Sequence, residues 1–144
     1  MPDILHHFHI EASPAKVFEV ISTPKGLNAW WPNDSKGVPG HGERYEFDFG
    51  PGYYWIAKVV DFKKEISICW EMTEADEDWT GTQVGFELKL KEGNGTIVEF
   101  SNTGWKEANE HFRRSSYCWA MYLRLLKGYV ETGEIVSYEK RLFV

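Results

Sequence analysis

The chain has little cysteine and no long hydrophobic run, and both absences exclude classes of protein. Only Cys69 and Cys118 occur among the 144 residues, far apart and outside any Cys-x-x-Cys pattern, which predicts two reduced, buried thiols in a cytoplasmic protein. No stretch approaches the roughly 18 apolar residues of a transmembrane helix. The first residues, MPDILHHFHIEAS, lack the basic start and apolar core of an export signal.

Basic clusters and catalytic motifs are also scarce. The formal net charge is −6 and the sequence pI about 5.4, with Arg113 and Arg114 as the one basic pair of note. A nucleic-acid binder normally carries a basic stripe, so we expect no nucleic-acid partner. The sequence contains no HExxH or GxSxG motif and no clear pair of catalytic carboxylates. We therefore expect binding rather than catalysis, and no cofactor.

Aromatic residues are abundant instead. They make up 16% of the chain, with seven Trp, seven Tyr and nine Phe. Aromatic side chains bury much area and leave awkward gaps between them, so a cavity forms more easily than in an aliphatic core. In the stretch GLNAWWPND, Trp30 and Trp31 are adjacent at a helix end. They either fill an ordinary core or line the mouth of a cavity.

The first third of the chain predicts a strand and two short helices. Residues 4–11 alternate apolar and polar side chains, which is typical of a strand with one buried face. Ser13 and Thr23 each precede a proline, and this pairing predicts an N-cap followed by the first helical residue. Pro32 ends the second helix, because proline disfavours the helical conformation for Trp31 before it.

After Gly37 the pattern changes to strands separated by glycine turns. We predict strands at 44–49, 53–62, 65–72, 79–91 and 95–103, the last two joined by the hairpin turn KEGNG. With the first strand this makes six, mostly joined by short turns and therefore antiparallel. The predicted inward-facing residues are Ile66, Ile68, Trp70, Val84, Phe86, Leu88, Val98, Phe100 and Asn102.

A long amphipathic helix is predicted at 105–132, with Gly133 as its C-terminal glycine. One broad arc of the helix carries the apolar side chains, and most charged residues lie opposite. The arc contains Phe112, Cys118, Trp119, Tyr122, Leu123, Leu125, Leu126, Tyr129 and Val130. A helix with so wide an apolar face must lie across the sheet. We find no linker, and expect residues 1–144 to form a single domain.

Two local groups suggest chemistry but have simpler explanations. His7, His9 and Glu11 share one strand face and could chelate a metal, but no second ligand cluster follows, so we expect no metal site. Cys118 lies one helical turn from Arg114, and a nearby cation can activate a thiol. A structural cysteine at the flank of the apolar arc is the favoured alternative.

The order of elements resembles the helix-grip fold of the START-like (SRPBCC) superfamily, which includes birch-pollen-allergen-like and polyketide-cyclase-like proteins. The segments IEASPAKVFEVISTPKGLNAWW, GTIVEFSNTGW and CWAMYLRLLKGYVETGE are similar to the branch of homologues of the activator of heat-shock-protein ATPase. The resemblance implies an α+β fold with a curved antiparallel sheet, two short helices and a long C-terminal helix across its concave face. Relatives often carry histidine where this chain has Asn102, and glycine where it has Trp55.

The resemblance also implies a site between the sheet and the long helix. We predict a small apolar or amphipathic ligand there, such as a lipid, with Asn102, Ser115 and Tyr122 near its polar groups. The predicted ligand-binding residues are Trp30, Trp31, Trp55, Trp70, Phe86, Phe100, Asn102, Ser115, Trp119, Tyr122 and Leu126.

Two other functions stay open. The first is a co-chaperone-like interaction domain with a chaperone partner and a role in stress response, although the extra amino-terminal domain of the eukaryotic activators is not found in this sequence. The second is a polyketide-cyclase-like or hydrolase-like enzyme. Tyr117, Met121 and Gly128 on the back of the long helix form either ordinary surface or a modest contact patch, so we expect a monomer or weak dimer.

Overall fold

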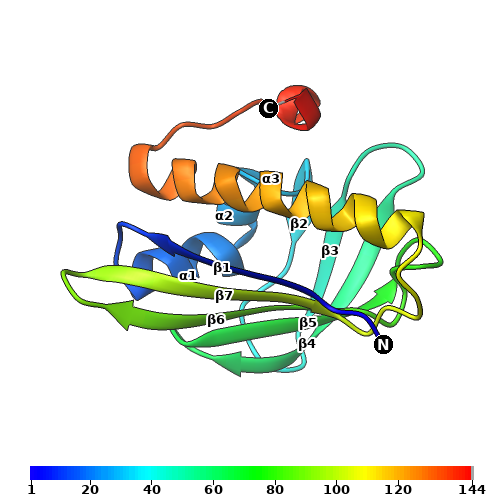
Figure 1. Cartoon of the computed structure of the whole chain (residues 1–144), viewed down its shortest axis with the longest axis horizontal. Coiled ribbons are helices and arrows are strands. Elements are labelled where there is room, and N and C mark those ends of the chain that lie inside the picture. The colour runs from blue at the N-terminus through cyan, green and yellow to red at the C-terminus, as the bar shows by residue number, and fades with distance from the viewer. Residues whose placement is uncertain (144) are drawn as a thin grey trace.

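A computed structural model describes residues 1–143, and its fold is a curved open antiparallel sheet gripped by a long helix. Figure 1 shows α3 (Glu110–Thr132) lying across one face of the sheet, with α1 (Pro14–Ser22) and α2 (Pro24–Asn28) on the same side. The sheet order is β1-β7-β6-β5-β4-β3-β2. Its strands are β1 (Ile4–Ile10), β2 (Asp34–Lys36), β3 (Arg44–Asp48), β4 (Tyr54–Lys63), β5 (Ser67–Glu74), β6 (Gln83–Lys91) and β7 (Gly95–Thr103). The helix-grip prediction is confirmed.

The two short helices begin at the predicted caps. Ser13 Oγ accepts a hydrogen bond from the Lys16 amide, and Thr23 Oγ1 accepts one from the Gly26 amide. These bonds satisfy amide groups that have no partner within the helix. A side chain at Gly26 would meet the Val20 backbone at 2.4 Å. Glycine therefore allows α2 to lie directly against α1.

The structure corrects the predicted strands in three places. The sheet has seven strands rather than six. The additional strand, β2, was not predicted because three residues are too few to show an alternating pattern. Strand β6 begins at Gln83, since Trp79 belongs to a turn in which its amide donates to Asp76 O. Ile66 does not face inward; it is 53% exposed and follows the tight turn at Glu65, whose φ is 65°.

The long helix starts five residues later than predicted. Asn109 is its N-cap and accepts a hydrogen bond from the Phe112 amide. Residues 105–109 form a loop instead, and Trp105 from this loop is buried. The predicted apolar arc is otherwise confirmed: Trp119, Leu123, Leu126 and Val130 are buried, and Phe112, Tyr122, Leu125 and Tyr129 pack partly buried against the core.

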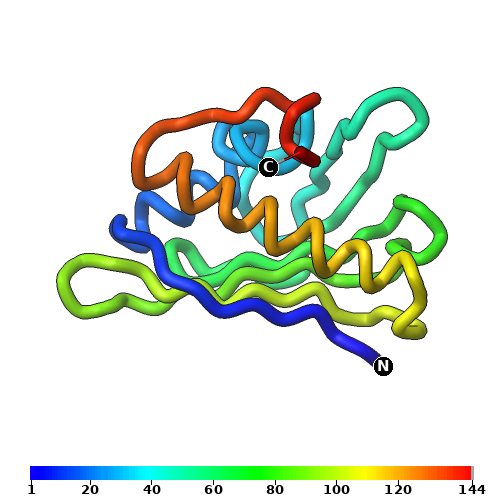
Figure 2. Tube along the Cα trace, turned by 45° about the horizontal axis from the view of Figure 1, so that its top comes forward, coloured from blue at the N-terminus to red at the C-terminus, as the bar shows by residue number. Residues whose placement is uncertain are grey.

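A tail after α3 was not predicted. It runs back over α3 towards the α2–β2 connection and ends in the short 3-10 helix η1 (Tyr138–Phe143), as Figures 1 and 2 show. Arg141 is 3% exposed, and its guanidinium donates to the carbonyl oxygens of Asn28, Trp31, Pro32 and Val136. The arginine thus holds the tail onto the end of α2.

Candidate ligand-binding pocket

The space between the middle of α3 and the sheet is filled by aromatic side chains. Trp119 points from α3 into this space and is 2% exposed. Its ring lies 4.5 Å from the ring of Phe100 and 4.9 Å from that of Trp31, measured between centroids. Trp70 and Phe86 pack edge to face beneath. This part of the space between the sheet and α3, where a cavity was expected, is therefore a packed core.

A pocket of about 170 Å³ remains under the first half of α3. Five aromatic side chains that line it contact one another in a closed circuit, which we call the aromatic belt. The centroid distances around the belt are 5.6 Å for Trp31–Phe49, 4.9 Å for Phe49–Trp55, 4.9 Å for Trp55–Trp79, 5.9 Å for Trp79–Trp119 and 4.9 Å for Trp119–Trp31.

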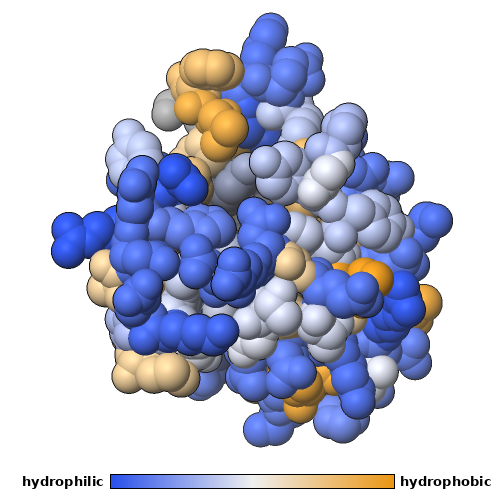
Figure 3. All heavy atoms as spheres, turned by 90° about the vertical axis from the view of Figure 1, so that its right-hand side faces the viewer, coloured by the Kyte–Doolittle hydropathy of each residue, from blue (hydrophilic) through white to orange (hydrophobic). Residues whose placement is uncertain are grey.

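The remaining lining residues all come from one face of α3. His111, Ser115, Cys118 and Tyr122 follow one another at spacings of four, three and four residues, and Arg114 flanks them. Side chains at these spacings share a helix face. Seen from the end of the molecule at which α3 begins, the surface is mostly hydrophilic and its apolar atoms form separate patches (Figure 3).

Hydrogen bonds already engage some polar groups of the pocket. The indole nitrogen of Trp79 donates to Ser115 Oγ at 3.2 Å. His111 Nδ1 lies 3.1 Å from an Asp78 carboxylate oxygen, and Arg114 lies 3.7 Å from the exposed carboxylate of Glu110. These contacts place the polar groups along the α3 side, facing the belt.

Burial keeps two further groups neutral. It raises the pKa of the Tyr122 phenol to about 12, and within residues 1–143 the Tyr122 hydroxyl makes no hydrogen bond. Burial also raises the pKa of the Cys118 thiol, against a smaller opposing effect of Arg114. Cys118 is consequently a protonated thiol at neutral pH, as expected of a structural cysteine, and both cysteines are free.

Asn102 lies behind the pocket and does not line it. Its side-chain nitrogen donates to Gln83 O at 3.0 Å, and its side-chain oxygen accepts from the indoles of Trp105 and Trp119, each at 3.1 Å. The residue is fully buried. The amide therefore orients two tryptophans rather than facing a ligand.

The structure divides the predicted ligand-binding residues into two groups. Five of them line the pocket: Trp31, Trp55, Ser115, Trp119 and Tyr122. Six do not and belong to the core around it: Trp30, Trp70, Phe86, Phe100, Asn102 and Leu126. The lining residues that sequence reasoning missed are Phe49, Trp79, His111, Arg114 and Cys118. The helical spacing of His111 and Cys118 from Ser115 would have predicted that both line the pocket. Trp79 was missed because it was assigned to a strand predicted at 79–91.

The adjacent tryptophans have different roles. Trp31 joins the belt, while Trp30 is fully buried and packs edge to face on Phe86. Their rings stack 6.0 Å apart. The tail braces this part of the pocket, because Arg141 bonds to Trp31 O and Tyr138 Oη donates to Phe49 O at 2.7 Å.

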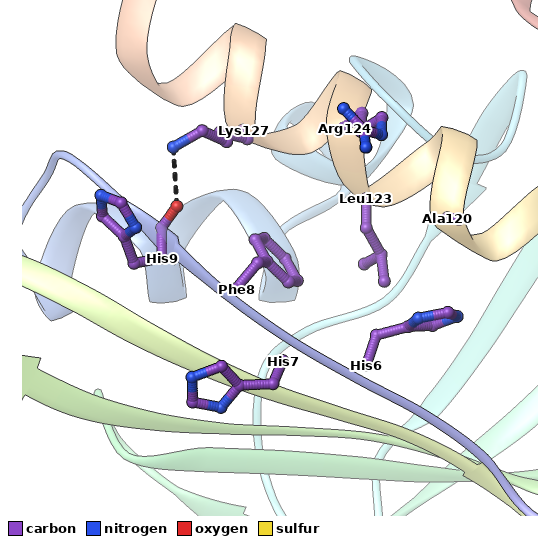
Figure 4. A pocket seen from close by; sticks show the side chains of 8 residues that line it. All are labelled: His6, His7, Phe8, His9, Ala120, Leu123, Arg124 and Lys127. Atoms are coloured by element: carbon purple, nitrogen blue, oxygen red, sulfur yellow. Dashed lines mark hydrogen bonds between the residues drawn. The ribbon is translucent and has the colours of Figure 1, made fainter.

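A second hollow of about 370 Å³ lies between β1 and α3 (Figure 4). Its lining is mixed: His6, His7, Phe8, His9, Ala120, Leu123, Arg124 and Lys127. Lys127 Nζ donates to His9 O at 2.7 Å across it, and His7 and His9 pair with Glu99 and Glu11. In the described part of the chain, His6 Nε2 in this hollow is buried without a partner. The hollow has only one apolar ring, Phe8, so we take the belt pocket, with its five rings, as the candidate site.

The histidine run has no metal-binding arrangement. His7 and His9 point to the surface, as predicted from the inward-facing Phe8 and Ile10. Among residues 1–143, no group of three or more His, Cys, Asp or Glu side chains is placed to hold a metal ion. Over the same residues, no helix is long and apolar enough to cross a membrane.

The fold and the pocket under its long helix define the class of protein: a helix-grip domain of the START-like (SRPBCC) superfamily. Residues 11–131 match the family described as activator of Hsp90 ATPase homolog 1-like protein, and the chain belongs to this family. No curated protein matches the chain significantly.

Solved structures show the same relationship. The Aha1 dimer of Colwellia psychrerythraea is 32% identical, over 93% of this chain and 99% of that chain, with a TM-score of 0.84. Protein BH1534 of Bacillus halodurans is 26% identical, over 91% and 98% of the two chains, with a TM-score of 0.76. SSP2350 of Staphylococcus saprophyticus, 16% identical over 94% and 96%, shares the fold with a TM-score of 0.79.

Proposed function

We propose that this protein binds a small apolar or amphipathic molecule in the belt pocket. The observation that carries this proposal is the aromatic belt itself, in which five rings contact one another around space that none of them fills. Phe49, Trp55 and Tyr122 are only partly buried, so the pocket opens to the surface while its walls remain aromatic. The pocket volume of about 170 Å³ is similar to the engineered cavities of about 150 Å³ that bind benzene.

The size of the pocket limits the ligand, or the part of it that enters, to about one aromatic ring or a short aliphatic chain. Binding would be driven by burial of apolar area against the belt. The Tyr122 hydroxyl, which lacks a partner within residues 1–143, would serve a polar group of the ligand. Lipids with long chains would need the packed core to open, so a lipid is a less suitable ligand.

The arrangement favours binding over catalysis. His111 is positioned by Asp78, but it makes no hydrogen bond to Ser115 or Cys118, the two possible nucleophiles of the pocket. An activated nucleophile needs such a bond to a base. With the thiol also kept protonated by burial, the enzyme alternative has the weaker support.

The proposal can be tested by fluorine NMR with para-fluorobenzyl alcohol, a neutral one-ring probe. We expect saturable line broadening with the wild-type protein and its loss in Ser115→Trp, whose added ring would occupy the pocket. Tyr117→Trp adds a ring on the same helix at a position that is 81% exposed, and we expect it to bind normally. Equal binding by all three proteins would contradict the proposal, and so would the failure of the wild-type protein to bind either this probe or its carboxylate analogue, para-fluorobenzoate.

A second candidate function is supported by the family and not by the pocket. The family description refers to activation of the Hsp90 ATPase, and the Colwellia relative is named Aha1. For this chain we propose a co-chaperone-like interaction as the alternative. The measurement is the ATPase rate of a bacterial Hsp90 with and without the protein, and an unchanged rate at saturating protein would exclude this function.

A further inference from the structure

We infer that the molecule bound in the belt pocket is anionic: a one-ring aromatic or similarly small apolar compound with a carboxylate, which Arg114 would bind at the α3 side. This inference rests on the proposed function, because it assigns a ligand class to the same pocket. It follows from where charge is placed around the pocket.

The lining of the pocket is charged with one sign only. Arg114 lines it and no aspartate or glutamate does; Asp78 and Glu110 lie beside the lining as partners of His111 and Arg114. The chain as a whole has 22 acidic and 16 basic residues and a net charge of −6. Acidic residues outnumber basic ones in the chain, yet none lines this pocket. Charge complementarity of this kind selects an anion.

Arg114 is available to a ligand. Its ion pair with Glu110 is long, at 3.7 Å, and both side chains are mostly exposed, 61% and 92%. Exposed pairs of this type contribute little to stability, so a ligand carboxylate can replace Glu110 without a large loss. The planar guanidinium can then hold both carboxylate oxygens at once.

His111 lies beside Arg114 in the lining and is held by partners of its own. It is more enclosed than Arg114, with a side chain 22% exposed, and Asp78 engages its Nδ1. The ring is also fixed edge to face on Trp105 at 5.7 Å. When Nδ1–H donates to Asp78 in the neutral tautomer, Nε2 is an acceptor, so the ligand carboxylate is assigned to Arg114 alone.

The opposite side of the pocket suits an apolar ring. The indole N–H groups of Trp79 and Trp119 are already used by Ser115 and Asn102, so these two walls offer ring surface rather than hydrogen-bond donors. A polyhydroxylated ligand would lose hydrogen bonds to water there without replacement. An aromatic cage for a cationic ligand is equally disfavoured, because Arg114 would repel the cation.

The test compares two probes of nearly equal size, para-fluorobenzoate and para-fluorobenzyl alcohol, by fluorine NMR titration. We expect the wild-type protein to bind the benzoate about three- to tenfold more tightly than the alcohol, as partly exposed charge pairs allow. Raising the salt to about 1 M, where the screening length falls to about 3 Å, should reduce the preference for the benzoate.

Two matched variants locate the effect. Arg114→Gln should lower the affinity for the benzoate to about that for the alcohol in the same variant. Arg113→Gln changes the adjacent exposed arginine, which does not line the pocket, and should alter neither affinity. Equal or tighter binding of the alcohol by the wild-type protein overturns the anionic assignment but leaves the proposed function intact. Failure of both probes to bind overturns the proposed function itself.

Discussion

The indole nitrogen of Trp79 donates a hydrogen bond to Ser115 Oγ at 3.2 Å, and this bond joins the β5–β6 turn to α3. Both residues are buried. A small hydroxyl on a buried helix face commonly bonds to a carbonyl of the preceding turn instead. Here it serves a tryptophan 36 positions away in sequence, and so fixes one member of the aromatic belt.

Ser115→Ala should destabilise the protein by about 1–3 kcal/mol, because the Trp79 N–H would be buried without an acceptor. Urea unfolding followed by circular dichroism measures this. Ser115→Trp loses the same acceptor, so if its added ring occupies free space its melting temperature should fall no further than that of Ser115→Ala. A melting temperature sharply lowered by overpacking, with unchanged probe binding, would show that Ser115 marks a close helix–sheet contact rather than free space.

Asn102→Leu should be among the most damaging single substitutions in the chain, at about 3 kcal/mol or more. It leaves two indole N–H groups and the Gln83 carbonyl without their partner. Asn33→Leu is the control, since Asn33 is exposed and its side chain makes no hydrogen bond within residues 1–143. Equal unfolding midpoints for the two variants would contradict this account of Asn102.

Arg141→Met should loosen the tail. The guanidinium bonds that hold η1 on the α2–β2 connection would be lost, at a cost of about 1–3 kcal/mol. Hydrogen exchange at residues 134–143 and at the pocket residues Trp31 and Phe49 should increase. Lys140→Met, at an exposed position of the same helix, should not change exchange. Unchanged exchange in Arg141→Met would mean that other contacts hold the tail.

Stability should fall with rising pH in the alkaline range because of Tyr122. Its pKa is raised to about 12 in the folded protein, while an unfolded tyrosine titrates near pH 10. Since the folded pKa lies above the unfolded one, this stability is fully present below pH ~10 and is lost as the pH rises towards ~12. Burial raises the pKa of Tyr45 too, which acts in the same direction.

The Tyr122→Phe variant isolates this effect. It should show a shallower loss of stability above pH ~10 than the wild-type protein, by at most about 1.4 kcal/mol per pH unit. Thermal unfolding at a series of pH values measures the slope. Tyr117→Phe, at an exposed position, is the matched control. An identical slope in Tyr122→Phe and the wild-type protein would contradict the raised pKa.

The elements with strong local signals were predictable from the sequence. The caps at Ser13 and Thr23 are set by neighbouring residues alone, and the apolar arc of α3 follows from a helical period sustained over several turns. The family and the placement of α3 across the sheet follow from the order of these elements.

The residues that shape the pocket were harder to predict, because distant contacts decide their positions. Tryptophan is common in strands, and Trp79 was predicted to begin one. The turn from Asp76 and the hydrogen bond to Ser115 place it under α3 instead. Trp105 reads as the start of a helix, yet its bond to Asn102 keeps it in a loop beneath the helix. The role of Arg141 in holding the tail could not be predicted, because its partners are backbone carbonyls and these leave no pattern in the sequence.

The bond between Lys127 Nζ and His9 O has a consequence for the behaviour of the sheet in concentrated solution. Strand β1 is an edge of the sheet, and a regular seven-residue edge is a template on which another chain can add a strand. Lys127 occupies a backbone acceptor on that edge and places a charge beside it. At the other edge, β2 offers only three residues. The sheet therefore ends at both sides in ways that oppose self-association into extended aggregates.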